Sequence, residues 1–433
     1  ATIRKPVMKI HIKNGRVIDP ISQLDSQLDV YIGAGKILAL GNAPAGFVAN
    51  QTIDASNLIV CPGLVDLSAR LREPGEEYKA TLVSELQAAV AGGVTSLACP
   101  PDTDPVLDEP GLVKMLKHRA KQLNLAHVYP LGALTRQLQG TVLAEMGELR
   151  EAGCVGFSQA NMAITDTQVL WRAMEYAATF GYTLFLYAED AFLAKDGVAH
   201  DGEVASRLGL KGIPSAAEAL ALAGLLRIAK ETGAKLHISR LSTAEGVNMI
   251  REAKKQGLSI SCDVSANHVH LTEHDLAYFD SNCHLKPPLR SQRDQAAISA
   301  GLKDGTIDAI CSDHTPVDDD GKLAPFAEAE IGASGLELLL TLTLKWANQE
   351  KISLIQALGL ISASSAKILG IPAGQLSVNS DADICVFDPS LYWKVEAGNL
   401  KSQGKNSPFT GLELAGKVKY TLVNGQLVYQ AQP

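Results

Sequence analysis

Two short runs of the chain carry side chains of the types that bind metal ions. His268-Val269-His270 places two imidazoles two residues apart, and on an extended strand this spacing puts both on the same side. A divalent ion needs about three or four protein donors, and the remaining histidines form no cluster with this pair in the sequence. We therefore expect His268 and His270 to be polar loop residues rather than a metal site.

Asp318-Asp319-Asp320-Gly321 is the second run, and it resembles the start of a calcium-binding loop. It lacks the later glutamate that completes such a loop, so we expect a mobile, solvated segment instead. No Ser/His/Asp or Cys/His arrangement suggests another catalytic site. The chain also has no phosphate-binding loop and no dinucleotide fingerprint.

The composition limits the partners. The 433 residues are 46% hydrophobic and 20% charged, which is typical of a globular protein with an ample core. A net charge of −8 argues against nucleic acid and anionic membranes as partners. No leader opens the chain and no apolar run reaches the ~18 residues of a membrane span. The cysteine pattern is typical of a reducing cytosol, so we expect a cytoplasmic protein. Seven scattered cysteines predict no disulfide framework.

The middle of the chain alternates short apolar runs with amphipathic stretches, which predicts an α/β fold with a (β/α)8 TIM barrel. The predicted strands are Val65–Leu71, Thr95–Cys99, His127–Leu131, Cys154–Ser158, Thr183–Tyr187, Lys235–Leu241, Leu258–Val264 and Ile307–Cys311. The predicted helices include Lys79–Ala91, Leu112–Gln122, Gln168–Phe180, Ala216–Thr232, Ala244–Gln256 and Arg293–Leu302.

Both ends of the chain are rich in short strands instead. Asn14-Gly15 and Asn424-Gly425 each stand between two such runs, and this dipeptide predicts a hairpin turn. We therefore predict a small β-sandwich from residues 1–60 and 370–433, and a barrel from residues 61–369.

In a barrel of this kind, catalytic residues lie at the C-terminal ends of the strands. Motifs at these ends resemble those of the dihydroorotase branch of the amidohydrolase superfamily, over about residues 10 to 430. They are Pro62–Asp66 with Leu71–Gly75, Pro101–Val106, Ala188-Glu189-Asp190, Pro287-Pro288-Leu289-Arg290, Ser312–Pro316, Pro325–Ala329, Gly335-Leu336-Glu337, Asp381-Ala382-Asp383 and Ser407-Pro408-Phe409.

The resemblance implies a metal site in active members, which interconvert carbamoyl-aspartate and dihydroorotate. There a bound zinc ion lowers the pKa of its water to about 7 and polarises the carbonyl. Its ligands are an H-x-H on strand one, a carboxylate or carboxylated lysine on strand four, histidines on strands five and six, and an aspartate on strand eight. We call the corresponding positions here the strand-end cluster: Ser68, Arg70, Gln159, Tyr187, Arg240 and Asp313.

Only Asp313 of the strand-end cluster keeps the ligand of the active family. Arginine is a fixed cation without a lone pair to donate, so Arg70 and Arg240 should repel zinc as well as fail to bind it. We therefore expect no metal and no catalytic residue. We predict instead that one or both guanidinium groups hydrogen-bond to Asp313, and that Tyr187 fills volume beside them with its hydroxyl bonded to a neighbour.

The positions that would bind the substrate have changed as well. Arg72 matches the carboxylate-binding arginine of the active family. Asp102, Lys286 and Val317 replace an asparagine, a second asparagine and a histidine. Of these four positions only Arg72 keeps an attractive contact for the substrate, so we expect no tight binding of carbamoyl-aspartate or dihydroorotate.

Inactive chains of this family accompany aspartate transcarbamoylase in some bacteria, and the resemblance implies the same role here. We expect a pseudoenzyme without a cofactor that forms a homodimer or larger assembly and supports the catalytic chain of aspartate transcarbamoylase. Two alternatives remain open: a weakly active or metal-relocated cyclic amidohydrolase, and a metabolite sensor that uses the remaining pocket.

Overall fold

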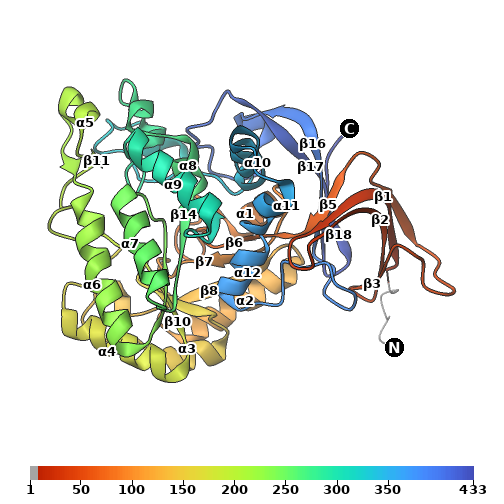
Figure 1. Ribbon diagram of the computed structural model, residues 1–433, viewed down its shortest axis with the longest axis horizontal. Helices are drawn as coiled ribbons and strands as arrows, with labels where there is room; N and C mark the ends of the chain where they lie inside the picture. The colour runs from red at the N-terminus through yellow and green to blue at the C-terminus, as the bar shows by residue number, and fades with distance from the viewer. Residues whose placement is uncertain (1–7) are drawn as a thin grey trace.

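A parallel barrel of eight strands forms the centre of the molecule (Figure 1), in a computed structural model that describes residues 8–433. Each barrel strand pairs with the next barrel strand along the chain, and all eight predicted strands are confirmed. Their bounds are β6 Leu64–Asp66, β7 Val94–Cys99, β8 His127–Ala133, β9 Gly156–Ser158, β10 Thr183–Leu186, β13 Lys235–Ile238, β14 Ile260–Ser265 and β15 Ala309–Cys311.

The barrel closes where the segments after β6 and β15 meet. Ala69 and His314 form a parallel bridge there. The Arg70 N–H donates to the His314 carbonyl at 2.8 Å, and the His314 N–H donates to the Ser68 carbonyl at 3.2 Å. Backbone hydrogen bonds therefore join the segment that carries Ser68 and Arg70 to the segment that carries Asp313.

Helices surround the barrel (Figure 1), and the six predicted ones correspond to α1, α2, α4, α6, α7 and α9. Side-chain caps fix their starts: the Thr81 hydroxyl accepts from the Ser84 N–H at α1, and Asp166 caps α4. The bounds are α1 Leu82–Ala91, α2 Pro110–Leu123, α3 Met146–Ala152, α4 Thr167–Phe180, α5 Glu203–Leu208, α6 Ala216–Thr232, α7 Ala244–Lys255, α8 Ala266–His270, α9 Gln292–Asp304, α10 Leu339–Glu350, α11 Leu354–Gly359 and α12 Ala363–Leu369.

Shorter elements lie in the connections. A two-stranded parallel sheet is formed by β11 Ala199–His200 and β12 Gly212–Ile213. Single turns of 3-10 helix are Arg136–Leu138, Glu273–Leu276, Ser281–Cys283, Asp319–Lys322 and Ala397–Asn399.

Both ends of the chain contribute to a second, separate sheet at one end of the molecule (Figure 1). Its main order is β18-β17-β16-β5-β1-β2-β3, with β4 paired to β1. The strands are β1 Ile10–Asp19, β2 Leu24–Gly33, β3 Lys36–Leu40, β4 Gln51–Asp54, β5 Ile59–Pro62, β16 Ile384–Lys394, β17 Glu413–Val423 and β18 Gln426–Gln430. The first seven residues of the predicted terminal domain lie outside the described residues.

The two Asn-Gly pairs behave differently. Asn424-Gly425 forms the turn between β17 and β18, as predicted. The hairpin predicted at Asn14-Gly15 is wrong, because both residues lie within β1 at an irregularity in its pairing with β2. The Asn14 N–H donates to an Asp29 carboxylate oxygen at 2.9 Å, and Gly15 packs so closely on Val60 that a Cβ atom would meet Val60 at 2.5 Å. The dipeptide therefore forms a bulge rather than a turn.

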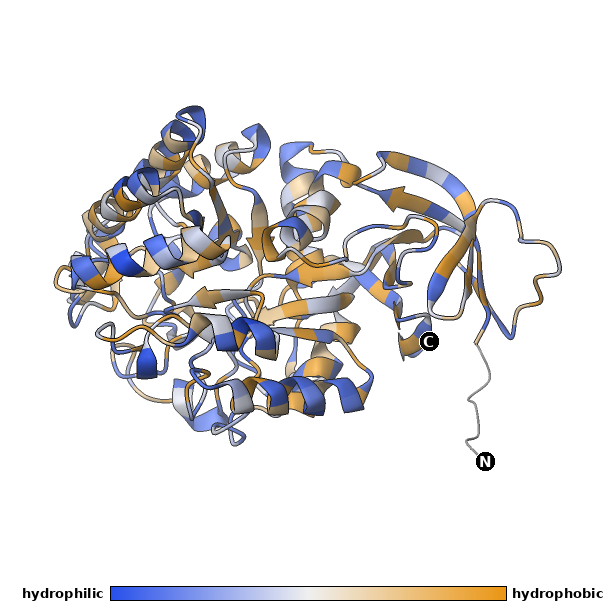
Figure 2. Ribbon diagram, turned by 90° about the horizontal axis from the view of Figure 1, so that it is seen from below, coloured by the Kyte–Doolittle hydropathy of each residue, from blue (hydrophilic) through white to orange (hydrophobic). Residues whose placement is uncertain are grey.

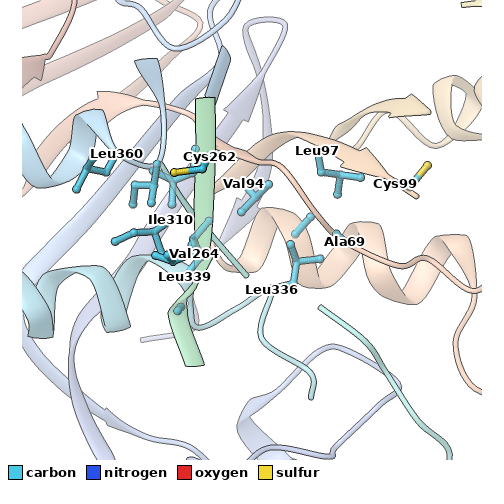
Figure 3. Packing of buried hydrophobic residues seen from close by; sticks show 14 of the residues in the cluster. Ala69, Val94, Leu97, Cys99, Cys262, Val264, Ile310, Leu336, Leu339 and Leu360 are labelled. Carbon is cyan, nitrogen blue, oxygen red and sulfur yellow. The ribbon is translucent and has the colours of Figure 1, made fainter. Parts of the chain in front are cut away.

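Apolar residues line the strands and the inward faces of the helices (Figure 2). Side chains of β14 and β15 lie close to Leu339 at the start of α10 (Figure 3), including Val264 and Ile310, and all three are at most 1% exposed. A separate apolar core fills the terminal domain. No helix among residues 8–433 is long and apolar enough to cross a membrane.

Candidate functional site

The strand-end cluster lies at the C-terminal ends of five barrel strands. Ser68 and Arg70 follow β6, Gln159 follows β9, Tyr187 follows β10, Arg240 follows β13 and Asp313 follows β15. The backbone is left-handed at Arg240 and Asp313, with φ of 55° and 49°. Such conformations are costly for non-glycine residues and persist where the surrounding structure holds them.

Asp313 lies between the two arginines of the cluster. Its Oδ1 atom is 3.6 Å from the Arg70 Nη1 atom and 3.6 Å from the Arg240 Nη1 atom, and each of the three side chains is at most 7% exposed. The predicted ion pairs are confirmed. The predicted hydrogen bonds are wrong, because both distances lie just outside hydrogen-bonding range and Oδ1 is buried without such a partner. Burial raises the pKa of Asp313 above its usual value, although Arg240 and Arg70 both lower it.

The Arg70 guanidinium is held by other acceptors. Its Nε atom donates to an Asp102 carboxylate oxygen at 3.0 Å, and its Nη1 atom donates to the Thr315 hydroxyl at 3.0 Å. Partial burial raises the pKa of Asp102, but Arg70 and the neighbouring arginines outweigh this effect and the net shift is downward. Asp102 is therefore a counter-ion of the cluster.

The Arg240 guanidinium also has other acceptors. Nη1 donates to the Lys286 carbonyl at 2.7 Å, and Nη2 donates to the Asn161 side-chain oxygen. The guanidinium carbon lies 4.5 Å from the centre of the Tyr187 ring, a cation–π contact. These partners explain why neither arginine binds Asp313 bidentately.

Tyr187 connects Arg240 to Glu189 and Lys286. Its hydroxyl donates to a Glu189 carboxylate oxygen at 2.9 Å, and the other Glu189 oxygen is 3.1 Å from the Lys286 ammonium group. Burial, followed by the charge of Glu189, raises the pKa of Tyr187 well above its usual value. The hydroxyl thus has the partner that was predicted for it.

Gln159 and Ser68 make no direct contact with Asp313 among the described hydrogen bonds. The Gln159 amide accepts from the Thr135 hydroxyl and donates to the Leu138 carbonyl, both at 2.9 Å. The Ser68 N–H donates to Asp66 at 3.3 Å. Gln159 and Ser68 therefore bond to groups near them. Of the six residues of the strand-end cluster, the structure brings together Arg70, Tyr187, Arg240 and Asp313.

The four substrate positions are also held by the protein's own groups. Arg72 donates to the Pro316 carbonyl at 3.0 Å and to Glu76 at 3.1 Å. Val317 is 1% exposed. The hollow beside Arg70, Arg72 and Asp102 measures about 10 Å³, which is roughly the least space that one water molecule needs.

Two buried carboxylates support the site and were missed from the sequence. Asp66 accepts from the Ser312 N–H at 3.0 Å, and Glu85 accepts from His314 Nε2 at 2.8 Å. His314 Nδ1 accepts two backbone N–H groups, from Gly335 at 3.0 Å and from Leu336 at 3.2 Å. No sequence spacing connects Glu85 with His314, since 229 residues separate them.

The two runs that resembled metal sites have other roles. His268 and His270 lie on α8, where His268 bonds to the Pro287 and Pro288 carbonyls and His270 to the Leu342 carbonyl. Burial lowers the pKa of both imidazoles to about 4. The segment after Asp318 forms a short 3-10 helix, in which Asp319 and Asp320 are exposed as expected of a solvated segment.

The donor chemistry of the strand-end cluster does not fit zinc. Of its six side chains only Asp313 is an ordinary ligand, and two fixed cations flank that carboxylate. Between residues 8 and 433, no three histidine, cysteine, aspartate or glutamate side chains converge in a way that could hold a metal ion.

Comparison with known proteins gives consistent matches. A family model described as dihydro-orotase-like matches residues 57–246. The "Dihydroorotase-like protein" of Pseudomonas aeruginosa is 45% identical over 98% of this chain and 100% of its own length. A protein named "Dihydroorotase" from a Geobacter species is 43% identical over the same shares.

A solved structure supports the fold. The L-hydantoinase (dihydropyrimidinase) from Arthrobacter aurescens superposes with a TM-score of 0.87 and 24% identity, covering 97% of this chain and 96% of that one. At this identity the match supports the barrel and the terminal sheet alone.

Proposed function

Because the chain belongs to the dihydroorotase-like family, we propose that it is a non-catalytic member, a pseudoenzyme of pyrimidine biosynthesis that assembles with aspartate transcarbamoylase and supports it. Family membership rests on relatives that match the chain over 98% of its length. Our proposal adds two statements to family membership: that this chain is inactive, and that its partner is aspartate transcarbamoylase.

One observation carries the loss of catalysis: two guanidinium groups flank the single remaining acidic ligand. Arg70 and Arg240 each lie 3.6 Å from Asp313 Oδ1. An active centre of this kind places metal ions beside that carboxylate, and two fixed cations oppose metal binding there. The barrel and its strand-end turns are nevertheless retained, which supports a role that needs the fold and not the chemistry.

The two alternatives have less support. A relocated metal site would need converging donors, but the imidazoles of His268 and His270 are each bonded to a backbone carbonyl. A sensor of a pathway dicarboxylate would need space beside Arg72, and the hollow there measures about 10 Å³. In the part of the chain that the structure describes, no lysine or arginine that could bind a carboxylate lines the hollow of about 250 Å³ beside Gln159 and Tyr187.

Co-purification tests the proposed assembly. The untagged chain should elute together with tagged aspartate transcarbamoylase from the same organism, and should raise the melting temperature or the activity of that enzyme. An aspartate transcarbamoylase that assembles and works equally well without this chain would contradict the proposal.

Metal content and turnover test the inactivity separately. The purified chain should contain no stoichiometric zinc and should neither form nor hydrolyse dihydroorotate. A relative with the complete ligand set, purified in the same way, is the matched control. About one tightly bound zinc per chain together with turnover would refute the pseudoenzyme role.

A further inference from the structure

A pocket of about 390 Å³ lies away from the strand-end cluster, where the barrel meets the terminal sheet. Helix α2, the first residues of β8 and the turn between β17 and β18 line it, and Figure 1 shows α2 and β8 on the side of the barrel toward that sheet. Its polar side chains include Lys117, His118, Lys121, His127 and Tyr129.

The lining is basic in an acidic protein. No aspartate or glutamate lines the pocket, whereas the whole chain has a net charge of −8. Helix α2 carries four lysine and arginine residues and no acidic one. Within residues 8–433, neither Lys117 nor Lys121 forms an ion pair with a carboxylate. The Lys117 ammonium group contacts the Gly153 carbonyl at 3.5 Å, and without a carboxylate partner both ammonium groups keep N–H donors for an anion.

The polar groups of the pocket are held in place. The Lys117 ammonium group lies 6.0 Å from the centre of the Tyr129 ring. Asp383 fixes His127 through a 3.2 Å contact and also accepts from the Asn424 N–H at 2.8 Å. Asp383 thus ties the barrel strand and the terminal turn together behind the pocket.

The rest of the lining is apolar. It comes from alanine, leucine and valine residues: Ala120, Leu125, Ala126, Val128 and Val423. The volume lies within the roughly 300–1,000 Å³ that small-molecule sites occupy. Lysine ammonium groups are common phosphate binders, and an apolar wall beside an aromatic ring suits a planar organic body.

We propose that this pocket binds a phosphorylated small molecule with a planar body, of the nucleoside monophosphate type. Lys117 and Lys121 face the phosphate, and the apolar wall with Tyr129 takes the planar part. The ligand contacts both the barrel and the terminal turn. This proposal does not depend on the role of the strand-end cluster.

Calorimetric titration of the full-length chain tests it. Adenosine and uridine monophosphates should each bind saturably, and adenosine or inorganic phosphate alone should bind at least about tenfold more weakly. Equal affinity for adenosine would refute the phosphate contact, and equal affinity for inorganic phosphate would refute the planar subsite.

Charge variants locate the site. The double substitution Lys117→Gln with Lys121→Gln should weaken nucleotide binding about tenfold or more, because both ammonium groups are lost. Lys114→Gln is the matched control, since Lys114 lies exposed on the same helix but does not line the pocket. Equal loss in the control would show non-specific attraction to a basic helix. Unchanged affinity in the double variant, with an unchanged melting temperature, would overturn the proposal, as would the absence of saturable binding in the parent.

Discussion

Arg70, Arg240 and Asp313 form a buried charged group at the C-terminal ends of the barrel strands. The Asp313 Oδ1 atom lies 3.6 Å from the Nη1 atom of each arginine and accepts no hydrogen bond. Both arginines donate to other acceptors. Attraction between the charges therefore offsets only part of the cost of burying the carboxylate, and the pKa of Asp313 stays above its usual value. The arginines are anchored independently of Asp313, so the two kinds of contact can be separated by mutation.

Asp313→Ala should lower the free energy of unfolding by on the order of 3–5 kcal/mol, because it leaves two buried guanidinium groups without their shared counter-ion. Urea unfolding at pH 7 measures this change. Asp319→Ala is the control, since Asp319 is exposed and should cost less than about 0.5 kcal/mol. An Asp313→Ala protein as stable as the parent would show that the ion pairs contribute little.

Restoring Ser68→His and Arg70→His together should not restore turnover of dihydroorotate. Gln159 and Tyr187 would still supply no metal ligand, and Arg240 would remain 3.6 Å from Asp313. A dihydroorotase assay with added zinc measures the outcome. Measurable activity would mean that the remaining positions obstruct the metal less than their chemistry implies.

The sequence predicted which residues occupy the strand ends but not how their side chains point. The alignment of motifs placed Arg70, Arg240 and Asp313 together, as the structure has them. It could not predict that Arg240 binds the Lys286 carbonyl and the Asn161 side chain, because a backbone acceptor leaves no pattern in the residue types and Asn161 is 79 residues away in the sequence. The hydrogen bonds expected at Asp313 failed for this reason.

At the scale of elements, buried imidazoles join helices and loops to the barrel. His270 on α8 bonds to the Leu342 carbonyl of α10, and His268 bonds to the carbonyls of the Pro287-Pro288 loop. Burial lowers the pKa of each to about 4, from a usual value near 6.5. The folded protein therefore keeps both imidazoles neutral over a pH range in which the unfolded chain protonates them.

His270→Gln should make the protein less sensitive to acid. The folded-state pKa is the lower one, so the unfolded state binds the extra proton and stability falls as the pH drops from about 6.5 toward 4. Between pH 7 and pH 5 the parent should lose on the order of 2 kcal/mol more than His270→Gln does. Urea unfolding at both pH values measures this.

His118→Gln provides the control for that comparison, because His118 is exposed. It should lose stability on acidification to the same extent as the parent. If His270→Gln also follows the parent, the imidazole of His270 does not stay neutral in the folded protein.

Strands and helices were more predictable than their ends. Apolar runs placed all eight barrel strands, but the first was expected to extend to Leu71 and ends at Asp66. The Asp66 carboxylate accepts from the Ser68 and Ser312 N–H groups, and beyond it the chain keeps only an isolated bridge, between Ala69 and His314. The Ser312 contact spans 246 residues, so local pattern does not reveal it. At Asn14-Gly15, tertiary packing likewise replaced the turn that the dipeptide favours with a bulge.

At the scale of the whole molecule, the barrel and the terminal sheet meet through buried contacts. The Thr421 hydroxyl of β17 donates to the Val90 carbonyl of α1 at 2.7 Å, and Ser402 and Gln403 donate to the buried carboxylate of Glu85. Glu85 also binds His314 at the barrel seam. One carboxylate therefore links the first helix, the last barrel strand and the C-terminal segment.

Prolonged treatment with a chelator should leave the melting temperature of the purified chain unchanged within about 1 °C, because a ligand stabilises a fold only when it binds the folded state. Differential scanning calorimetry before and after dialysis against EDTA measures this. A relative that retains the complete metal site should lose stability under the same treatment. A large decrease in this chain would reveal a structural metal.

The closed seam at Ala69 and His314 bears on how the protein reaches its mature state. A backbone bridge joins the two edges of the barrel there, and the Glu85–His314 pair fixes the second edge to helix α1. In the non-catalytic role proposed above, maturation would require translation and folding alone, with no metal ion to load. A subunit built in this way would be available for assembly in a zinc-starved cell, in which a metal-dependent relative would accumulate in its immature form.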